Sequence, residues 1–151
     1  MTESILVRAP VGVTYRTLTD LDAWPRWHSG CRSRRTARPA GTDAPGAADH
    51  VALVLPAPRR GMRGRPWRLE VAVHGWRHDA GVRWDVRGDV ELTAEWWLES
   101  CTEGTVVHHV VHEVVGREAR VVRHRQAMMH AMQAMKDHLE LAVALASGRI
   151  P

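Results

Sequence analysis

Residues 118 to 146, near the end of the chain, contain neither glycine nor proline, and this segment constrains the fold most. Apolar side chains recur in it at spacings of three and four, the period of one helix face. These side chains are Val121, Val122, Met128, Met132, Met135, Leu139 and Val143. At about 1.5 Å per residue the helix would span roughly 40 Å, enough to cross a small domain. We predict one long helix, ended by Gly148 and Pro151, that lies along a sheet.

The middle of the chain has the period of β-strands. Val- and Trp-rich stretches are separated there by short turns that contain glycine or acidic residues. The stretches are residues 67 to 76, 81 to 88, 90 to 100 and 104 to 116. Within the second, Val82, Trp84 and Val86 alternate with Arg83 and Asp85, which indicates one buried face. We predict an antiparallel meander.

The first third of the chain predicts one strand followed by two short helices. Residues 4 to 8 form an apolar run that stops before Pro10, and Val11, Tyr15 and Leu18 then share a helix face. Asp22 is the expected N-cap of a second helix that Gly30 ends. Residues 34 to 66 are rich in Pro, Gly and Arg, with only residues 50 to 55 strand-like, so we expect a mobile segment there.

The element order is therefore a strand, two short helices, about six strands and a long helix. Helices and strands segregated in this way indicate an α+β fold. With 151 residues and 44% hydrophobic residues, the chain is expected to form a single domain over residues 1 to 151.

Charge and cysteine content exclude several function classes. The formal net charge is +4, but the arginines are scattered apart from residues 58 to 66, so we expect no nucleic-acid partner. Cys31 and Cys101 form no CxxC pair and are expected to be free thiols in a reducing compartment. No signal peptide and no membrane span are recognisable, which predicts a cytoplasmic protein.

The string HHVVHE contains the residue types of a metal site, but its strand period argues against one. His108 and His112 fall on one face and His109 and Glu113 on the other. Members of each pair lie roughly 13 Å apart along a strand, whereas zinc ligands lie about 2 Å from the metal. We therefore predict no metal site and no cofactor.

Three stretches carry a resemblance to a known family: VRAPVGVTYRTLTDLDAWPRWHSGC, EWWLESCTEGTVVHHVV and MKDHLELAV. The sequence resembles the SRPBCC or START-like superfamily, and most closely its polyketide cyclase/dehydrase branch. The resemblance implies a helix-grip (Bet v 1-like) fold, in which a curved antiparallel sheet wraps around the C-terminal helix. It also implies that Trp24 and Trp27 plug one end of the sheet as packing residues, while His28 faces either the cavity or solvent.

The resemblance further implies a groove between the sheet and the long helix, with His109 and Glu113 pointing into it. His109 is then the candidate base, Glu113 a supporting acid, and Tyr15 or Arg35 a hydrogen-bond donor. The alternative is that His109 and Glu113 are purely structural. The candidate ligand-binding residues are Trp84, Trp96, Leu98, Val111, Met128, Met132 and Met135.

The resemblance predicts that the chain binds a hydrophobic small molecule and catalyses polyketide-type cyclisation or dehydration. A non-catalytic carrier or sensor of a lipid, quinone or similar ligand is the alternative, and an interaction module is a third class. We also expect a homodimer, because the sheet's outward face would carry an apolar patch. That patch would consist of Val106, Val110, Val114, Trp76 and Trp97, with His108 and His112 among them.

Overall fold

The computed structural model describes residues 1–36, 49–57 and 65–148. Its elements follow the predicted order and include six strands after the short helices. They are β1 (Thr2–Val7), α1 (Val11–Thr19), η1 (Leu21–Ala23), α2 (Trp24–Trp27), β2 (Arg32–Arg35), β3 (Asp49–Leu55), β4 (Trp67–Arg77), β5 (Gly81–Gly88), β6 (Glu91–Cys101), β7 (Gly104–Val115) and α3 (Glu118–Ala146). Most of the segment predicted to be mobile, namely residues 37–48 and 58–64, lies outside the described residues.

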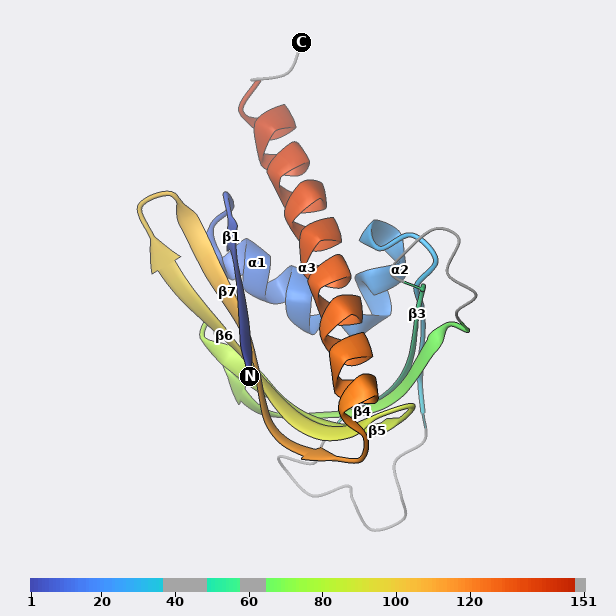
Figure 1. The fold of residues 1–151 in the computed structure, drawn as a ribbon. Helices are drawn as coiled ribbons and strands as arrows, with labels where there is room; N and C mark the ends of the chain where they lie inside the picture. Colours follow the sequence, from blue (N-terminus) through green and yellow to red (C-terminus); the bar gives the residue numbers. More distant parts are fainter. Residues whose placement is uncertain (37–48, 58–64, 149–151) are drawn as a thin grey trace.

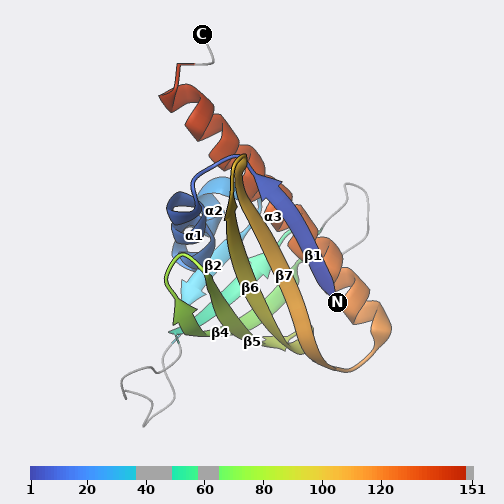
Figure 2. The same cartoon turned by 90° about the vertical axis from the view of Figure 1, so that its left-hand side faces the viewer.

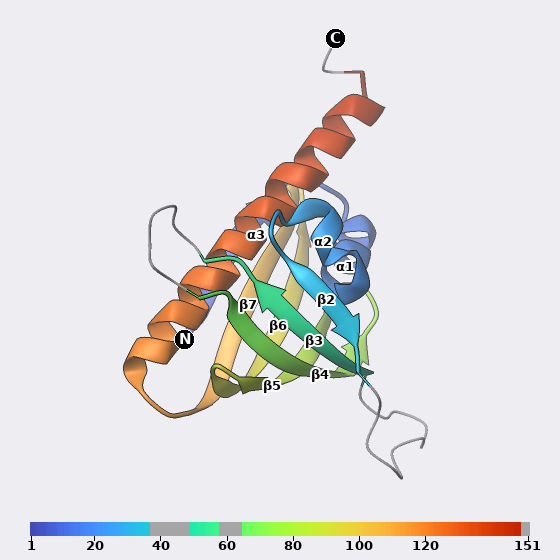
Figure 3. The same ribbon diagram turned by 90° about the vertical axis from the view of Figure 1, so that its right-hand side faces the viewer.

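All seven strands form one antiparallel sheet with the order β1-β7-β6-β5-β4-β3-β2. The sheet curves into a cup, and α3 lies along the concave side of the cup (Figure 1). The two short helices α1 and α2 lie on that same side, beside α3 (Figure 3). The predicted α+β helix-grip fold is therefore confirmed.

The long helix is held against the sheet by its apolar face and by polar contacts to β1. Met128, Met132 and Met135 are fully or almost fully buried. Lys136 donates from Nζ to the carbonyl oxygen of Leu6 at 2.8 Å, while Glu140 accepts from the backbone N–H of Arg8 at 2.9 Å. Beyond this contact the C-terminal part of α3 extends past the sheet (Figure 2).

The short second helix differs from its prediction in how it begins. Its N-cap is Ala23, the last residue of the 3-10 turn η1, and the Asp22 side chain makes no capping bond. Asp22 instead forms an ion pair with Arg35 of β2. Gly30 ends the turn after α2 with a positive φ of 81°, as its position predicted.

A β-bulge in β7 changes which side chains face the interior. Ala94 of β6 pairs with Val111, but the next residue of β6, Thr93, pairs with Glu113, so His112 is an extra residue. Directly opposed residues point to the same face of a sheet. Glu113 therefore joins Thr93 on the outer face, and the prediction that Glu113 points into the groove is wrong.

The same bulge alters the predicted outward patch. Val114 pairs with the buried Leu92 and so belongs to the inner side of the sheet. On the outer face, Trp97 lies under the guanidinium of Arg77 and donates a hydrogen bond to Glu95. The outer face is thus more polar than its sequence indicated, and the homodimer stays a prediction. Among the described residues, no helix combines the length and the hydropathy needed to cross a membrane.

Candidate functional site

The interior between the sheet and the helices is built around three tryptophans. The ring centroid of Trp24 of α2 lies 5.7 Å from that of Trp84 of β5 and 6.5 Å from that of Trp96 of β6. The ring centroids of Trp84 and Trp96 are 5.3 Å apart. The Trp24 indole nitrogen donates to the carbonyl oxygen of Leu18 at 2.9 Å. The Trp-Pro-Arg-Trp turn thus closes one end of the cup, which is the packing role that the resemblance implied for Trp24.

His109 of β7 points into this interior, as the resemblance implied, and is only 2% exposed. Its ring centroid lies 4.3 Å from that of Trp96 and 5.7 Å from that of His124. Neither ring nitrogen has a hydrogen-bond partner within the described residues. Burial, reinforced by the nearby His124, lowers the pKa of His109 well below its usual value, so the ring is neutral at pH 7.

His124 of α3 is the partner that the sequence analysis missed. It is buried against His109, and burial lowers its pKa to about 4. Its Nδ1 lies 3.4 Å from the indole N–H of Trp67, which can only donate. A neutral His124 that accepts at Nδ1 carries its proton on Nε2. The sequence feature that indicates burial of His124 is its position four residues before Met128, on the apolar face of the helix.

A third buried histidine lies at the α2 end of the interior. His28 is 2% exposed, and its ring stacks on Trp27 at 5.9 Å and meets the exposed His130 of α3 edge-on at 5.1 Å. Burial and then the proximity of His130 lower the pKa of His28 to about 4. This placement decides the question that the sequence left open, because His28 faces inward.

Several buried ring nitrogens of this interior have no hydrogen-bond partner among the described residues, and we call them the unsatisfied nitrogens. They are Nδ1 and Nε2 of His109, Nε2 of His124, Nε1 of Trp96, Nε2 of His28 and Nε1 of Trp27. In folded proteins about nine in ten buried polar groups are paired with protein or ordered water. Each of these six atoms is therefore available for a hydrogen bond to water or to a ligand.

The two predicted donors do not join His109. Tyr15 of α1 packs edge-on against His78 in the β4–β5 turn at 5.6 Å, and burial together with the Asp79 carboxylate raises its pKa. Arg35 lies on the edge strand β2 and binds Asp22 at 2.7 Å with its side chain 61% exposed. Their expected role beside the base is therefore not supported by their positions.

The predicted ligand-binding residues do face the interior. All seven are buried in one continuous apolar core: Trp84, Trp96, Leu98, Val111, Met128, Met132 and Met135. Side chains from β5, β6, β7 and α3 thus fill the space between the sheet and the long helix. A ligand bound in this interior must displace some of these side chains.

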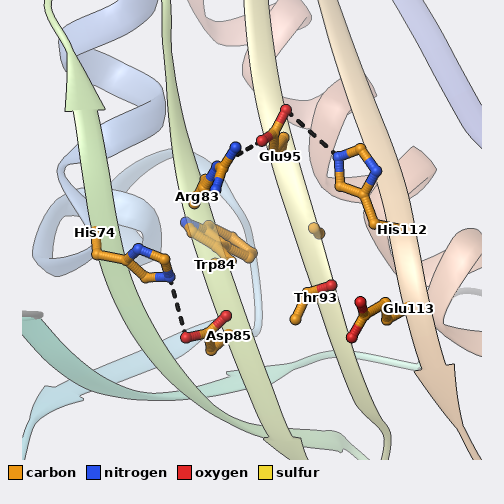
Figure 4. A pocket seen from close by; sticks show the side chains of 9 residues that line it. His74, Arg83, Trp84, Asp85, Thr93, Glu95, His112 and Glu113 are labelled. Carbon is orange, nitrogen blue, oxygen red and sulfur yellow. Dashed lines mark ion pairs between the residues drawn. The ribbon is translucent and has the colours of Figure 1, made fainter.

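The outer face of the sheet carries a separate, polar hollow of about 390 Å³ at the β-bulge (Figure 4). Glu95 lines it, between Arg83 and His112, and forms ion pairs with Arg83 at 2.5 Å and His112 at 3.4 Å. Burial raises the pKa of Glu95, but its hydrogen bonds and the Arg83 charge outweigh this effect and lower it overall. His74 pairs with Asp85 at 3.0 Å.

Contacts of this kind between polar side chains are common on exposed sheet faces. Glu113, the predicted acid, also lines this hollow rather than the interior. Within the described ranges, no group of three or more His, Cys, Asp or Glu residues could hold a metal ion. Cys31 and Cys101 are both free thiols, the first buried and the second exposed.

The fold is similar to those of solved proteins. A START superfamily protein from Mycobacterium smegmatis matches with a TM-score of 0.66 and 14% identity, over 94% of this chain and 97% of that one. The Zhui aromatase/cyclase from Streptomyces sp. R1128 matches with a TM-score of 0.69 and 12% identity, over 95% of this chain and 94% of that one. The di-domain ARO/CYC StfQ from the steffimycin biosynthetic pathway matches with a TM-score of 0.69 and 13% identity, over 95% of this chain and 51% of that one.

The chain therefore has the helix-grip fold of START-like proteins, as the sequence resemblance implied. At these low identities the likeness concerns the fold alone. No protein-family model matches the sequence, and no curated protein matches it either.

Proposed function

We propose that this protein binds a mostly apolar, aromatic small molecule between the curved sheet and α3, with His109 as its main polar contact. The observation that carries the proposal is that both ring nitrogens of His109 are buried without a partner in the described part of the chain. Leaving such groups unpaired costs about 1–3 kcal/mol each. A ligand oxygen beside His109 would remove this cost.

The same region supplies donors for that oxygen. Nε2 of His124 carries the ring proton, because Nδ1 accepts from Trp67, and Nε1 of Trp96 is always a donor. Both belong to rings that touch the His109 ring. The arrangement suits a carbonyl or hydroxyl group on an aromatic body that stacks on the indoles.

The methionines of α3 have side chains that can rearrange to make room for a ligand. Met128, Met132 and Met135 have flexible, unbranched side chains that repack around ligands of different shape. They lie on α3, along the concave side of the sheet (Figure 1), whereas the rigid indoles of Trp84 and Trp96 are buried on β5 and β6. We infer that ligand uptake repacks the methionines and leaves the sheet unchanged.

A non-catalytic carrier or sensor fits these features better than a cyclase. A general base works best with a pKa near the working pH, and burial holds the pKa of His109 far below that value. The predicted acid and donors, Glu113, Tyr15 and Arg35, also lie away from it. Cyclisation or dehydration of a poly-β-carbonyl chain is the second candidate, and the resemblance in fold to aromatase/cyclases favours it.

Tryptophan fluorescence tests the binding proposal, because Trp24, Trp84 and Trp96 line the same interior. Titration with 2-naphthol or anthraquinone should change the emission saturably. Met132→Asp should abolish the response by placing an unpaired charge in the apolar wall, whereas Gln133→Asp, on the exposed side of the same helix turn, should preserve it. If no aromatic ligand gives saturable binding to the native protein, the proposal is wrong.

A turnover assay separates the two candidate functions. For a carrier, cyclisation of a model poly-β-carbonyl substrate proceeds at the same rate with and without the protein. For an enzyme, the native protein accelerates cyclisation, and His109→Ala lowers that rate by about 10²- to 10⁴-fold, the usual contribution of a general base. Calorimetric titration of the same variant reports whether ligand affinity is kept.

A further inference from the structure

We propose that the interior has a second polar subsite at Trp27 and His28, so that its ligand is a rigid aromatic molecule with hydrogen-bonding oxygens at two ends. This inference rests on the proposed function, because it concerns the same interior. It differs in assigning polar recognition to the C-terminal end of α2, where the resemblance implied a packing role for Trp27 and left the direction of His28 open.

The second subsite is defined by two of the unsatisfied nitrogens. Nε1 of Trp27 is buried and can only donate, so it requires an acceptor such as a carbonyl or phenol oxygen. Nε2 of His28 is also buried without a partner in the described ranges, on a ring stacked against Trp27. Neither atom touches His109, so an oxygen bound at His109 leaves this pair unsatisfied.

A continuous series of ring contacts joins the two subsites. Trp27 lies 4.9 Å from Trp24, which lies 6.5 Å from Trp96, whose ring in turn lies 4.3 Å from His109. The polar ends are thus separated by indole surfaces that offer no free hydrogen-bonding group at Trp24, since its N–H is bonded to Leu18. Stacking surface between two polar ends matches an aromatic ligand that is apolar in its middle.

The second subsite lies where α2 meets α3. His28 contacts His130, an exposed residue of α3, and α2 lies beside α3 (Figure 3). The proposed ligand places one oxygen at Trp27 and His28 and its other oxygen at His109. If the ligand places no oxygen there, the hydrogen-bond partner of Nε1 of Trp27 and Nε2 of His28 is water, whichever ligand is bound.

The test compares ligands that differ by one hydroxyl group. The probes are 4-phenylphenol and biphenyl-4,4′-diol, with the corresponding mono- and dihydroxy-p-terphenyls as a longer pair, titrated by calorimetry. In the native protein the second hydroxyl should tighten binding about 3- to 10-fold in at least one pair, the effect of one added hydrogen bond. Trp27→Phe, which keeps the ring and removes the N–H, should abolish this gain and change monohydroxy affinity less than twofold.

Two further variants complete the design. Trp76→Phe makes the same chemical change on the exposed end of β4 and should keep the full gain. His28→Leu removes Nε2 of His28, the other unsatisfied nitrogen of the second subsite, so the second hydroxyl should tighten binding less in this variant. Circular dichroism shows whether His28→Leu folds. If this variant does not fold, Trp27→Phe alone tests the proposal.

The outcomes distinguish the two proposals. If monohydroxy probes bind but the second hydroxyl adds nothing in either pair, the interior site stands and the second subsite is wrong, with water at these nitrogens. A gain that survives in Trp27→Phe likewise overturns the subsite. If none of the four probes binds, the proposed function itself is wrong, and the subsite is rejected with it.

Discussion

His109 is a buried polar side chain whose presence works against stability. Replacing it by leucine, which has a similar volume, removes two nitrogens that are unpaired within the described residues. We predict that His109→Leu raises the free energy of unfolding by about 1–2 kcal/mol, because a buried unpaired polar group is replaced by an apolar one. Urea unfolding monitored by circular dichroism measures the change, and calorimetry should show weaker binding of hydroxylated ligands.

His124→Leu is the matched comparison for that prediction. It also removes a buried imidazole, but it deprives the Trp67 indole of its acceptor, so its gain in stability should be smaller or absent. A loss of stability in His109→Leu would mean that its nitrogens are already paired, and the basis of the site would be removed.

At the scale of single residues, the sequence grouped side chains by sheet face correctly where the strand period is unbroken. The grouping failed where an extra residue interrupts the period. His109 faces inward, as the resemblance implied for its face of the strand. Glu113 does not, because His112 is one inserted residue and reverses the alternation beyond it. His124 was missed because a polar residue on an apolar helix stripe becomes meaningful only when its neighbour from β7 is known.

At the scale of elements, the β6–β7 turn is the tightest approach between backbones around the site. Gly104 has a φ of +149°, and a Cβ added there would overlap the carbonyl oxygen of Val7 and lie 2.9 Å from Cα of Arg8. We predict that Gly104→Ala lowers the free energy of unfolding by more than about 3 kcal/mol, since it separates β1 from β7. Thermal or urea unfolding provides the measurement.

Gly116, in the turn before α3, is the control for this prediction. Its φ is +122°, so alanine is strained there as well, but a Cβ would meet nothing within 4 Å among the described residues. Gly116→Ala should therefore cost about 1 kcal/mol. Equal effects at the two glycines would show that backbone strain, and not the contact with β1, is what matters.

Long elements were predicted best, because many residues contribute to each pattern. The helix spans Glu118–Ala146, as its unbroken period indicated, and the four strands of the meander lie within about a residue of their expected ends. β2 is only four residues long and has three arginines, so no alternation marks it. Asp22 was misplaced as an N-cap because its pairing with Arg35 depends on a tertiary contact.

At the scale of the whole molecule, the buried neutral histidines make stability depend on pH. Burial lowers the pKa of His28 and of His124 to about 4 in the folded protein, from the ordinary histidine value of about 6.5. Below pH 6.5 the unfolded chain therefore binds protons that the folded protein does not, and stability falls as the pH falls. We predict a loss of about 2 kcal/mol per buried histidine between pH 7 and pH 5.

Urea unfolding at pH 7.5, 6, 5.5 and 5 measures this dependence. His124→Leu should make the pH dependence shallower over this range, while His138→Gln, on the exposed face of α3, should leave it unchanged. The window lies above the range in which most carboxylates titrate, so histidines dominate it. Stability that stays constant from pH 7.5 to pH 5 would contradict the burial of these rings as neutral groups.

For the whole molecule, the sequence predicted the architecture and not the interior. Periods of two and 3.6 fix the sheet and the helix, and the resemblance supplied the way they pack together. The joined rings of Trp27, Trp24, Trp96 and His109 come from three separate elements, namely α2, β6 and β7. Such contacts between distant residues depend on the curvature of the sheet, which no local pattern encodes.

The open sheet leaves two edges, and their chemistry bears on how the protein resists aggregation. The edge strand β2 is short and carries Arg32, Arg34 and Arg35, so two copies approaching edge to edge would repel each other. At the other edge, Lys136 of α3 already occupies the carbonyl of Leu6. A solution of this protein should therefore resist fibril growth until the arginines are replaced, for example by threonine, or until the long helix detaches from β1.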